Sequence, residues 1–326
     1  MTSPARELTL WVIADPAARH LRLLEKLPDT TSIVTGKTAE IFQQNGGSPD
    51  AILITTGKSD VLSQVWPGEG SSLRWVHSLS AGVEHILPFD GLRESAVPFT
   101  NAAGVYARSL GEYAVASMLF FAKNLRRMLS QQANGVWEAF DVEELHGKTL
   151  GVVGYGGIGK QAANRAKAFG MKILALRRNT AAPDEVVDEY VPREHLHSLL
   201  SRADYVVVSV PHTPETTGMI GEAELRAMPP NAVIINLGRG PAIVESALVD
   251  ALRERRIRGA ALDVFDVEPL PAGHPFYGLD NVLLSPHCAD HTPTWLEDSM
   301  EFFLQNYERF ASGQPLLNLV DKSAGY

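Results

Sequence analysis

The segment Gly154, Tyr155, Gly156, Gly157, Ile158 and Gly159 constrains the fold of this chain more than any other feature of the sequence. It follows a short apolar run at residues 150–153 and precedes a helical pattern at residues 160–169. Glycines at such a junction permit a tight turn and let the backbone approach a pyrophosphate, which the free N–H groups of the helix N-terminus can bind. A glycine pattern alone also fits a flexible turn, but its place between strand and helix predicts a dinucleotide site.

The second half of the chain alternates apolar runs with helical patterns. The runs lie at residues 150–153, 172–176, 205–210, 232–237, 260–262 and 282–284. Because they are apolar throughout, they predict strands buried on both faces, as in a parallel sheet covered by helices. A shorter series at residues 10–14, 51–55, 75–79 and 97–100 predicts a smaller α/β unit. A chain of 326 residues exceeds the usual size of one core, so we expect two domains.

Two longer helical patterns flank this second series. Residues 109–132 carry apolar side chains on every face, which predicts one long helix packed between two bodies. Its most apolar part, residues 113–122, is too short to span a membrane and is bounded by Glu112 and Lys123. A last helix is expected at residues 293–311, because Gly313 and Pro315 are typical of a helix end.

Charge and cysteine content exclude several classes of protein. The formal net charge is −9 and no run of Lys or Arg stands out, so we expect no nucleic-acid partner. Cys288 is the single cysteine, which rules out an intramolecular disulfide. The first residues lack the basic flank and apolar stretch of a secretory signal, and we expect a cytoplasmic protein with no membrane partner.

Two arginines follow the strand after the glycine turn. An NAD enzyme usually carries an acidic residue there, which binds the ribose hydroxyls. Here Arg177 and Arg178 occupy that corner. Paired guanidinium groups suit a 2′-phosphate through charge-assisted hydrogen bonds and stacking on adenine, so the sequence favours NADP. NAD stays possible, because two solvated arginines at a strand end would also fit the pattern.

Three polar residues stand at predicted strand ends, where open α/β sheets bind ligands: Arg239, Glu268 and His287. Arg239 can hold a substrate carboxylate with two parallel hydrogen bonds. His287 can supply the proton that a ketone needs on reduction, and Glu268 can orient the imidazole and hold its pKa up. Singly, each residue has an ordinary structural explanation. Their order after a dinucleotide fold predicts a catalytic group.

Seven segments, in order along the chain, carry a resemblance to a known family. They are SAGVEH from Ser80, NAAG from Asn101, GKTLGVVGYGGIG from Gly147, VPHTPETTGMI from Val210, NLGRG from Asn236, LDVFDVEPLP from Leu262 and SPH from Ser285. Together they resemble the D-isomer-specific 2-hydroxyacid dehydrogenases, which include glyoxylate/hydroxypyruvate reductases and phosphoglycerate dehydrogenases. The resemblance spans nearly the whole chain.

This resemblance implies an architecture and a set of site residues. It implies two Rossmann-like domains with doubly wound parallel sheets: a discontinuous substrate domain of residues 1–104 and 292–326, and an inserted NAD(P)-binding domain of residues 105–291. A homodimer is expected, and no metal. The resemblance gives Arg239, Glu268 and His287 the roles described above. Backbone amides of Ala81, Gly82 and Val83 would also hold the substrate carboxylate. Further cofactor contacts would come from Val210, Pro211, His212, Thr216, Leu237, Gly238 and Asp263, the last on the nicotinamide side.

We therefore expect an NADP-preferring D-2-hydroxyacid dehydrogenase that reduces a 2-oxo acid of the glyoxylate or hydroxypyruvate type. The nicotinamide would supply the hydride and His287 the proton. One alternative is an NAD-dependent enzyme similar to phosphoglycerate dehydrogenases. Another is a non-enzymatic protein that senses dinucleotides, similar to the corepressors that share this architecture.

Overall fold

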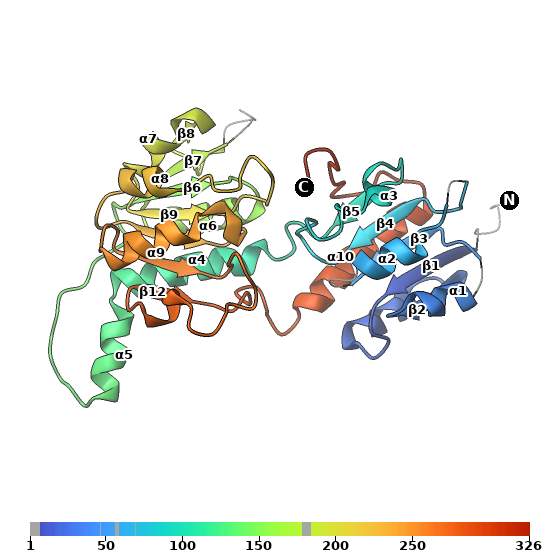
Figure 1. Cartoon of the computed structure of the whole chain (residues 1–326), viewed down its shortest axis with the longest axis horizontal. Coiled ribbons are helices and arrows are strands. Elements are labelled where there is room, and N and C mark those ends of the chain that lie inside the picture. Colours follow the sequence, from blue (N-terminus) through green and yellow to red (C-terminus); the bar gives the residue numbers. More distant parts are fainter. Residues whose placement is uncertain (1–6, 46, 56–58, 69, 178–183) are drawn as a thin grey trace. The chain divides into compact units, whose positions relative to one another are not determined.

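The chain forms two compact units, each built on its own parallel sheet (Figure 1). The computed structural model describes residues 7–45, 47–55, 59–68, 70–177 and 184–326. The first unit comprises Met1–Tyr106 and Thr292–Tyr326, and the second comprises Ala107–His291. The first unit therefore contains both ends of the chain.

The sheet of the first unit has five strands in the order β2-β1-β3-β4-β5. They are β1 (Leu8–Ile13), β2 (Thr31–Gly36), β3 (Ala51–Ile54), β4 (Trp75–Ser78) and β5 (Phe99–Asn101). On one face, alternate strand residues such as Leu10 and Trp75 pack with Phe303 of α10 (Trp295–Ala311) and with η1 (Arg19–Lys26). On the other face, their neighbours pack with α1 (Ala39–Gln44) and α2 (Ser59–Val65). The short helix α3 (Asp90–Arg93) precedes β5. The last helix thus completes the first core.

The sheet of the second unit has seven parallel strands in the order β12-β11-β10-β9-β6-β7-β8. They are β6 (Thr149–Val153), β7 (Lys172–Leu176), β8 (Glu189–Val191), β9 (Tyr205–Val208), β10 (Val233–Asn236), β11 (Gly259–Leu262) and β12 (Val282–Leu284). The connecting elements are α6 (Gly157–Ala168), η2 (Arg193–His195), α7 (Leu196–Leu200), α8 (Glu222–Ala227), η3 (Gly240–Ala242), α9 (Glu245–Arg253) and η4 (Pro275–Gly278). The chain builds outward from β6 to β8 and then returns to add β9 on the other side. The carboxyl ends of β6 and β9 thus border a switch point, where sheets of this kind bind ligands.

The predicted parallel α/β fold is confirmed, and every predicted strand is present. Two further strands, β2 and β8, were not predicted. Both lie at a sheet edge, and β2 has only one fully buried residue, Gly36. Edge strands tolerate polar residues because one side of the strand faces solvent, so they lack the continuous apolar signal of the central strands.

The single helix predicted over residues 109–132 is wrong, because the structure has two helices there. They are α4 (Ala107–Ala122) and α5 (Leu125–Ala133). Asn124, between them, has a φ of 50°. This left-handed conformation cannot continue an α-helix, and asparagine is one of the few residues that adopt it readily. No helix among the described residues has the length and apolarity needed to cross a membrane.

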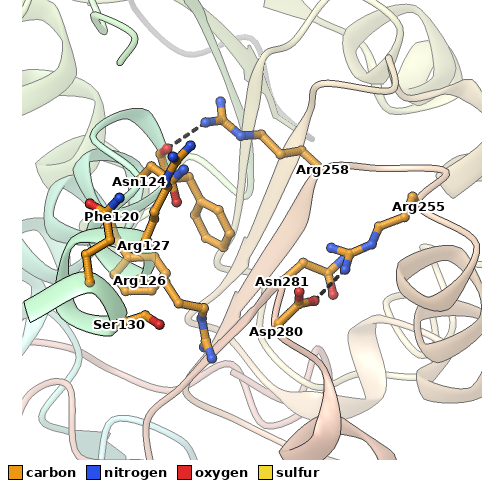
Figure 2. Close-up of a pocket in the computed structure, with 11 residues that line it drawn as sticks. Phe120, Asn124, Arg126, Arg127, Ser130, Arg255, Arg258, Asp280 and Asn281 are labelled. Atoms are coloured by element: carbon orange, nitrogen blue, oxygen red, sulfur yellow. Dashed lines mark hydrogen bonds and ion pairs between the residues drawn. The ribbon is translucent and has the colours of Figure 1, made fainter. Parts of the chain in front are cut away.

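Helix α5 and the segment that returns from it form an arm, residues 125–148, which projects from the second unit (Figure 1). Arginines hold this arm to the sheet. The guanidinium of Arg258 donates to Glu143 at 2.8 Å and to the carbonyl of Phe121 at 2.6 Å, while Arg126 donates to the carbonyl of Val282 at 2.5 Å. Figure 2 shows Arg126 and Arg258 among the residues that line a cavity of about 460 Å³. We infer that Arg126 and Arg258 serve to anchor the arm to the second unit.

Candidate active site

The glycine turn joins β6 to α6 at the switch point of the second sheet. Gly154 has a φ of 99°, and a Cβ there would lie 2.9 Å from the backbone of Ser209. A Cβ on Gly159 would lie 2.4 Å from the carbonyl oxygen of Gly154. Both positions therefore require glycine for backbone reasons. A Cβ on Gly156 would meet no atom within 4 Å, so the outer side of the turn is open to a ligand at the N-terminus of α6.

The loops after β9 and β10 border this turn. The Ser209 hydroxyl donates to the carbonyl of Gly154 at 2.8 Å, and a Cβ on Gly238 would lie 2.6 Å from the carbonyl oxygen of Val210. The Thr216 hydroxyl donates to the carbonyl of Pro211 at 2.6 Å and accepts from the amide of Thr213 at 2.9 Å, which fixes the loop between them. The structure thus places Val210, Pro211, His212, Thr216, Leu237 and Gly238 in two loops at the end of the sheet that carries the glycine turn.

Basic and acidic side chains lie near the carboxyl end of β7. Arg177 is half-buried there, whereas Arg178 lies outside the described residues. The hydroxyl of Tyr155 donates to Asp184 at 3.0 Å. The amide of Val186 and the Tyr155 hydroxyl hold the pKa of Asp184 below its usual value, and the charges of Lys160 and Arg177 act in the same direction. Sequence reasoning missed this carboxylate, because Asp184 reaches the glycine turn from the loop before β8 and not from the end of β7.

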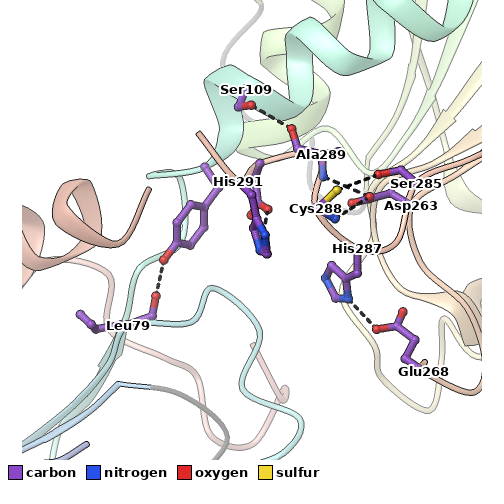
Figure 3. A network of polar contacts seen from close by, with 11 residues as sticks. Leu79, Ser109, Asp263, Glu268, Ser285, His287, Cys288, Ala289 and His291 are labelled. Atoms are coloured by element: carbon purple, nitrogen blue, oxygen red, sulfur yellow. Dashed lines mark hydrogen bonds and ion pairs between the residues drawn. The ribbon is translucent and has the colours of Figure 1, made fainter. Parts of the chain in front are cut away.

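A short hydrogen bond joins Glu268 and His287 (Figure 3). The distance between Nδ1 of His287 and Oε2 of Glu268 is 2.6 Å, and Oε1 of Glu268 accepts from the amide of Phe265 at 2.9 Å. This bond to Glu268 raises the pKa of His287, against the effect of partial burial. Burial acts to raise the pKa of Glu268, but the hydrogen bonds from His287 and Phe265 outweigh it and lower that pKa. The pair therefore favours a charged imidazole beside a charged carboxylate.

Arg239 lies beside this pair at the start of η3. A Cβ on Gly240 would lie 2.0 Å from the carbonyl carbon of Phe265, so the turn after Arg239 is in direct contact with the segment that leads to Glu268. The positive charge of Arg239 lowers the pKa of both Glu268 and His287. The structure thus brings the three polar residues from separate strand ends into one electrostatic group.

An apolar cavity of about 630 Å³ adjoins the Glu268–His287 pair. Its lining belongs entirely to the second unit and consists of Phe265, Glu268, Pro269, Leu270, Tyr277, Leu284, Ser285, Pro286 and His287. A mainly apolar wall around a few convergent polar groups is typical of a small-molecule site.

The segment Ala81, Gly82 and Val83 follows β4 in the first unit. The side chain of Asn101 donates to the carbonyl of Ala81 at 2.7 Å, and the carbonyl of Val83 accepts from the amides of Ile86 and Leu87. Val83 is buried, whereas Ala81 and Gly82 are half-buried. These contacts hold the segment at the carboxyl end of β4.

Comparison with known proteins gives consistent results. Residues 115–289 match the model of the D-isomer specific 2-hydroxyacid dehydrogenase, NAD binding domain. A glyoxylate reductase of Thermococcus litoralis is 33% identical over 97% of this chain and 91% of its own length. A D-3-phosphoglycerate dehydrogenase of Methanocaldococcus jannaschii is 33% identical over 95% of this chain, which spans 59% of that relative.

A solved structure extends this likeness to the whole fold. It is an NADPH-dependent glyoxylate/hydroxypyruvate reductase from Sinorhizobium meliloti in complex with NADP and sulfate. It superposes with a TM-score of 0.85 at 26% identity, and the match covers 98% of this chain and 100% of that one.

Proposed function

Given that the chain belongs to the D-isomer specific 2-hydroxyacid dehydrogenases, a family of NAD(P)-dependent oxidoreductases, we propose that it reduces a small 2-oxo acid to the D-2-hydroxy acid. Glyoxylate and hydroxypyruvate are the proposed substrate type, since relatives over most of the chain are named for them. The observation that carries the proposal is the 2.6 Å bond between His287 and Glu268 beside Arg239.

The residues at the switch point fit a nicotinamide dinucleotide. The open side of Gly156, at the N-terminus of a 12-residue helix, leaves room and free N–H groups for a pyrophosphate. The glycine turn, the loops at Val210 and Gly238, and Arg177 would hold the cofactor. When bound, the dinucleotide supplies the hydride.

The side chains of this chain supply binding and the proton. Arg239 would hold the substrate carboxylate with two hydrogen bonds and so fix the adjacent carbonyl. His287, kept charged by Glu268, would donate the proton on its Nε2 to the carbonyl oxygen as the alkoxide develops. Glu268 would keep the other ring nitrogen engaged, which fixes the orientation of the imidazole.

A panel of 2-oxo acids, assayed with NADPH and with NADH, tests this function. We expect turnover of glyoxylate or hydroxypyruvate, and loss of most of it in His287→Ala. Turnover of neither by the wild type, together with saturable cofactor binding, would favour the dinucleotide-sensing alternative. Oxidation of phosphoglycerate with NAD would favour an enzyme similar to phosphoglycerate dehydrogenases.

For the cofactor we propose a preference for NADP. Arg177 supports it, since a guanidinium at the ribose corner can pair with a 2′-phosphate. Asp184 acts in the opposite direction, because a carboxylate repels that phosphate and can accept from a ribose hydroxyl. We expect Arg177→Ala to lower kcat/KM for NADPH more than for NADH, and Asp184→Ala to do the reverse. A wild-type preference for NADH would overturn the proposal.

We also propose that the enzyme is a cytoplasmic homodimer formed through the arm. Leu125, Met128 and Leu129 lie on the exposed face of α5, which buries no residue against its own unit. Trp137 is fully exposed at 102% of its reference area. Several exposed large apolar side chains in one short arm are typical of a protein interface. Light scattering on Leu129→Glu should find a monomer, whereas Ile33→Glu, on an edge strand of the first unit, should leave a dimer. A monomeric wild type would refute the dimer.

A further inference from the structure

His287 has an unusual backbone conformation. Its φ is 50°, in the left-handed region that residues other than glycine rarely adopt. Such a conformation persists only where the surrounding structure holds it in place. The turn that follows, residues 288–291, therefore needs contacts strong enough to keep His287 in this state.

Asp263, at the carboxyl end of β11, supplies the first of these contacts. Its Oδ1 accepts from the amide of Cys288 at 3.0 Å and from the amide of Ala289 at 3.1 Å. The residue is only 2% exposed, and within the described part of the chain no lysine or arginine forms an ion pair with it. A buried carboxylate that no lysine or arginine pairs with depends strongly on its hydrogen bonds, so the bonds between Asp263 and these two amides stabilise both the carboxylate and the turn.

Helix α4 holds the same turn from another side. The hydroxyl of Ser109 donates to the carbonyl of Ala289 at 2.9 Å. Within the turn, the amide of His291 donates to the carbonyl of Cys288 at 3.0 Å. Figure 3 shows Asp263 and Ser109 reaching the backbone after His287 from separate segments. Three backbone groups directly after the histidine are thus fixed by two side chains remote in sequence.

We propose that Asp263 and Ser109 are positioning residues, which hold the turn after β12 so that His287 keeps the conformation in which its Nδ1 meets Glu268. This inference rests on the proposed function and adds two residues to its machinery. It gives Asp263 a role separate from any contact with the nicotinamide, and it gives Ser109 a role that no strand-end pattern predicts.

Variants at the two positions separate positioning from simple stability. Asp263→Asn keeps an oxygen that can accept from both amides, whereas Asp263→Ala removes it. We expect Asp263→Ala to lower kcat about 100-fold, since a small misplacement of a catalytic group costs about that much. We expect Asp263→Asn to restore at least a tenth of the wild-type kcat. Ser109→Ala should lower kcat by about threefold to tenfold, with little change in KM for the cofactor.

Asp204→Ala is the matched control. Asp204 also accepts from a backbone amide, that of Thr149 at 2.8 Å, but at the amino ends of the strands, whereas Asp263 lies at a carboxyl end. Its loss should lower the melting temperature and leave kcat nearly unchanged. A kcat for Asp263→Ala within threefold of the wild type would overturn the proposal. So would a defect confined to the KM of the cofactor, because Asp263 would then be a cofactor contact alone.

A second measurement does not depend on turnover. In proton NMR, the hydrogen of a short imidazole–carboxylate hydrogen bond resonates far downfield. The resonance of the His287–Glu268 bond can be assigned because it should disappear in His287→Gln. We expect Asp263→Ala to remove or broaden this resonance and Asp204→Ala to preserve it. An unchanged resonance in Asp263→Ala would refute the positioning role even in a protein that reduces no 2-oxo acid. If the wild type reduces a 2-oxo acid and the variants at Asp263 and Ser109 change neither kcat nor the resonance, the inference is refuted and the proposed function stands.

Discussion

Four charged side chains of the second unit interact electrostatically with His287. Glu268 and Asp263 raise its pKa and Arg239 lowers it, while Asp290 interacts with it electrostatically from the following turn. Because the balance raises the pKa, the imidazole stays protonated to higher pH than a free histidine. Reduction needs that proton, so its rate should be full at low pH and decline as the pH rises through the raised pKa.

The variant Glu268→Gln tests whether Glu268 raises the pKa of His287. Glutamine keeps an oxygen that can accept from Nδ1 but removes the negative charge, so the pKa of His287 should fall. The basic limb of kcat/KM for reduction should move to lower pH by the same amount. The pH profiles of the wild type and of Glu268→Gln, measured with saturating cofactor, provide the comparison. A basic limb at the wild-type position in the variant would contradict the pairing as the source of the shift.

Arg239 permits a prediction about substrate binding. Lysine keeps the positive charge but lacks the planar fork that binds both oxygens of a carboxylate. We expect Arg239→Lys to lower kcat/KM about 100-fold, equivalent to about 2.7 kcal/mol, mostly through KM. Arg226→Lys, at an exposed ion pair with Glu222, serves as the control and should keep the wild-type constants. If steady-state kinetics give Arg239→Lys the KM of the wild type, Arg239 does not bind the substrate carboxylate as proposed.

Sequence reasoning succeeded best where a residue follows a buried strand. Arg239, Glu268 and His287 could be proposed together because parallel strands end at one edge of the sheet, and the structure brings them into one electrostatic group. Their catalytic roles stay predictions. Asp184 and Ser109 could not be found in this way, since their contacts depend on the path of a loop and on the rotation of a helix. Neither leaves a periodic signal in the sequence.

At the scale of elements, the contact of α4 with α6 depends on one glycine. A Cβ on Gly111 would lie 2.7 Å from Cβ of Gln161 and 2.9 Å from its carbonyl carbon. Gly111→Val should therefore destabilise the fold by about 1–3 kcal/mol, despite the better helix propensity of valine. Ala116→Val, at an exposed position of the same helix, should cost only a few tenths of a kcal/mol. Urea unfolding of both variants would measure the difference, and equal midpoints would show that the helices separate at little cost.

The sequence predicted a helix or strand correctly where its hydrophobic pattern matched the burial of that element in the fold. The central strands are apolar throughout and were found, whereas β2 and β8 lie at edges where polar residues are tolerated. The break at Asn124 was missed because apolar residues continue on both sides of it. In α5 the apolar side chains face away from their own unit, so their pattern indicates a helix but not its partner.

At the scale of the whole molecule, the proposed functions are distributed between the two units, which have separate apolar clusters. The main apolar cluster of the second unit draws every member from residues 153–284. In the first unit, one cluster combines the N-terminal strands with α10, and the other combines them with α1, α2 and Val320. Arg239, Glu268 and His287 all belong to the second unit, together with the glycine turn. The segment Ala81 to Val83 belongs to the first. We therefore propose that cofactor binding and proton supply involve only the second unit, whereas the proposed substrate contacts come from both.

This division predicts the behaviour of a fragment. Residues 107–291, expressed alone, should fold cooperatively, because their main apolar cluster contains no side chain of the first unit. The fragment should bind NADPH with an affinity within about tenfold of the full chain, a difference of about 1.4 kcal/mol, because the glycine turn and its neighbouring loops all belong to it. It should show no measurable reduction of glyoxylate, since the amides at residues 81–83 are missing. Thermal unfolding, titration calorimetry and a turnover assay would check the three statements. A folded fragment that binds no cofactor would mean that the glycine turn and its neighbouring loops are insufficient, and that the first unit takes part in holding the dinucleotide.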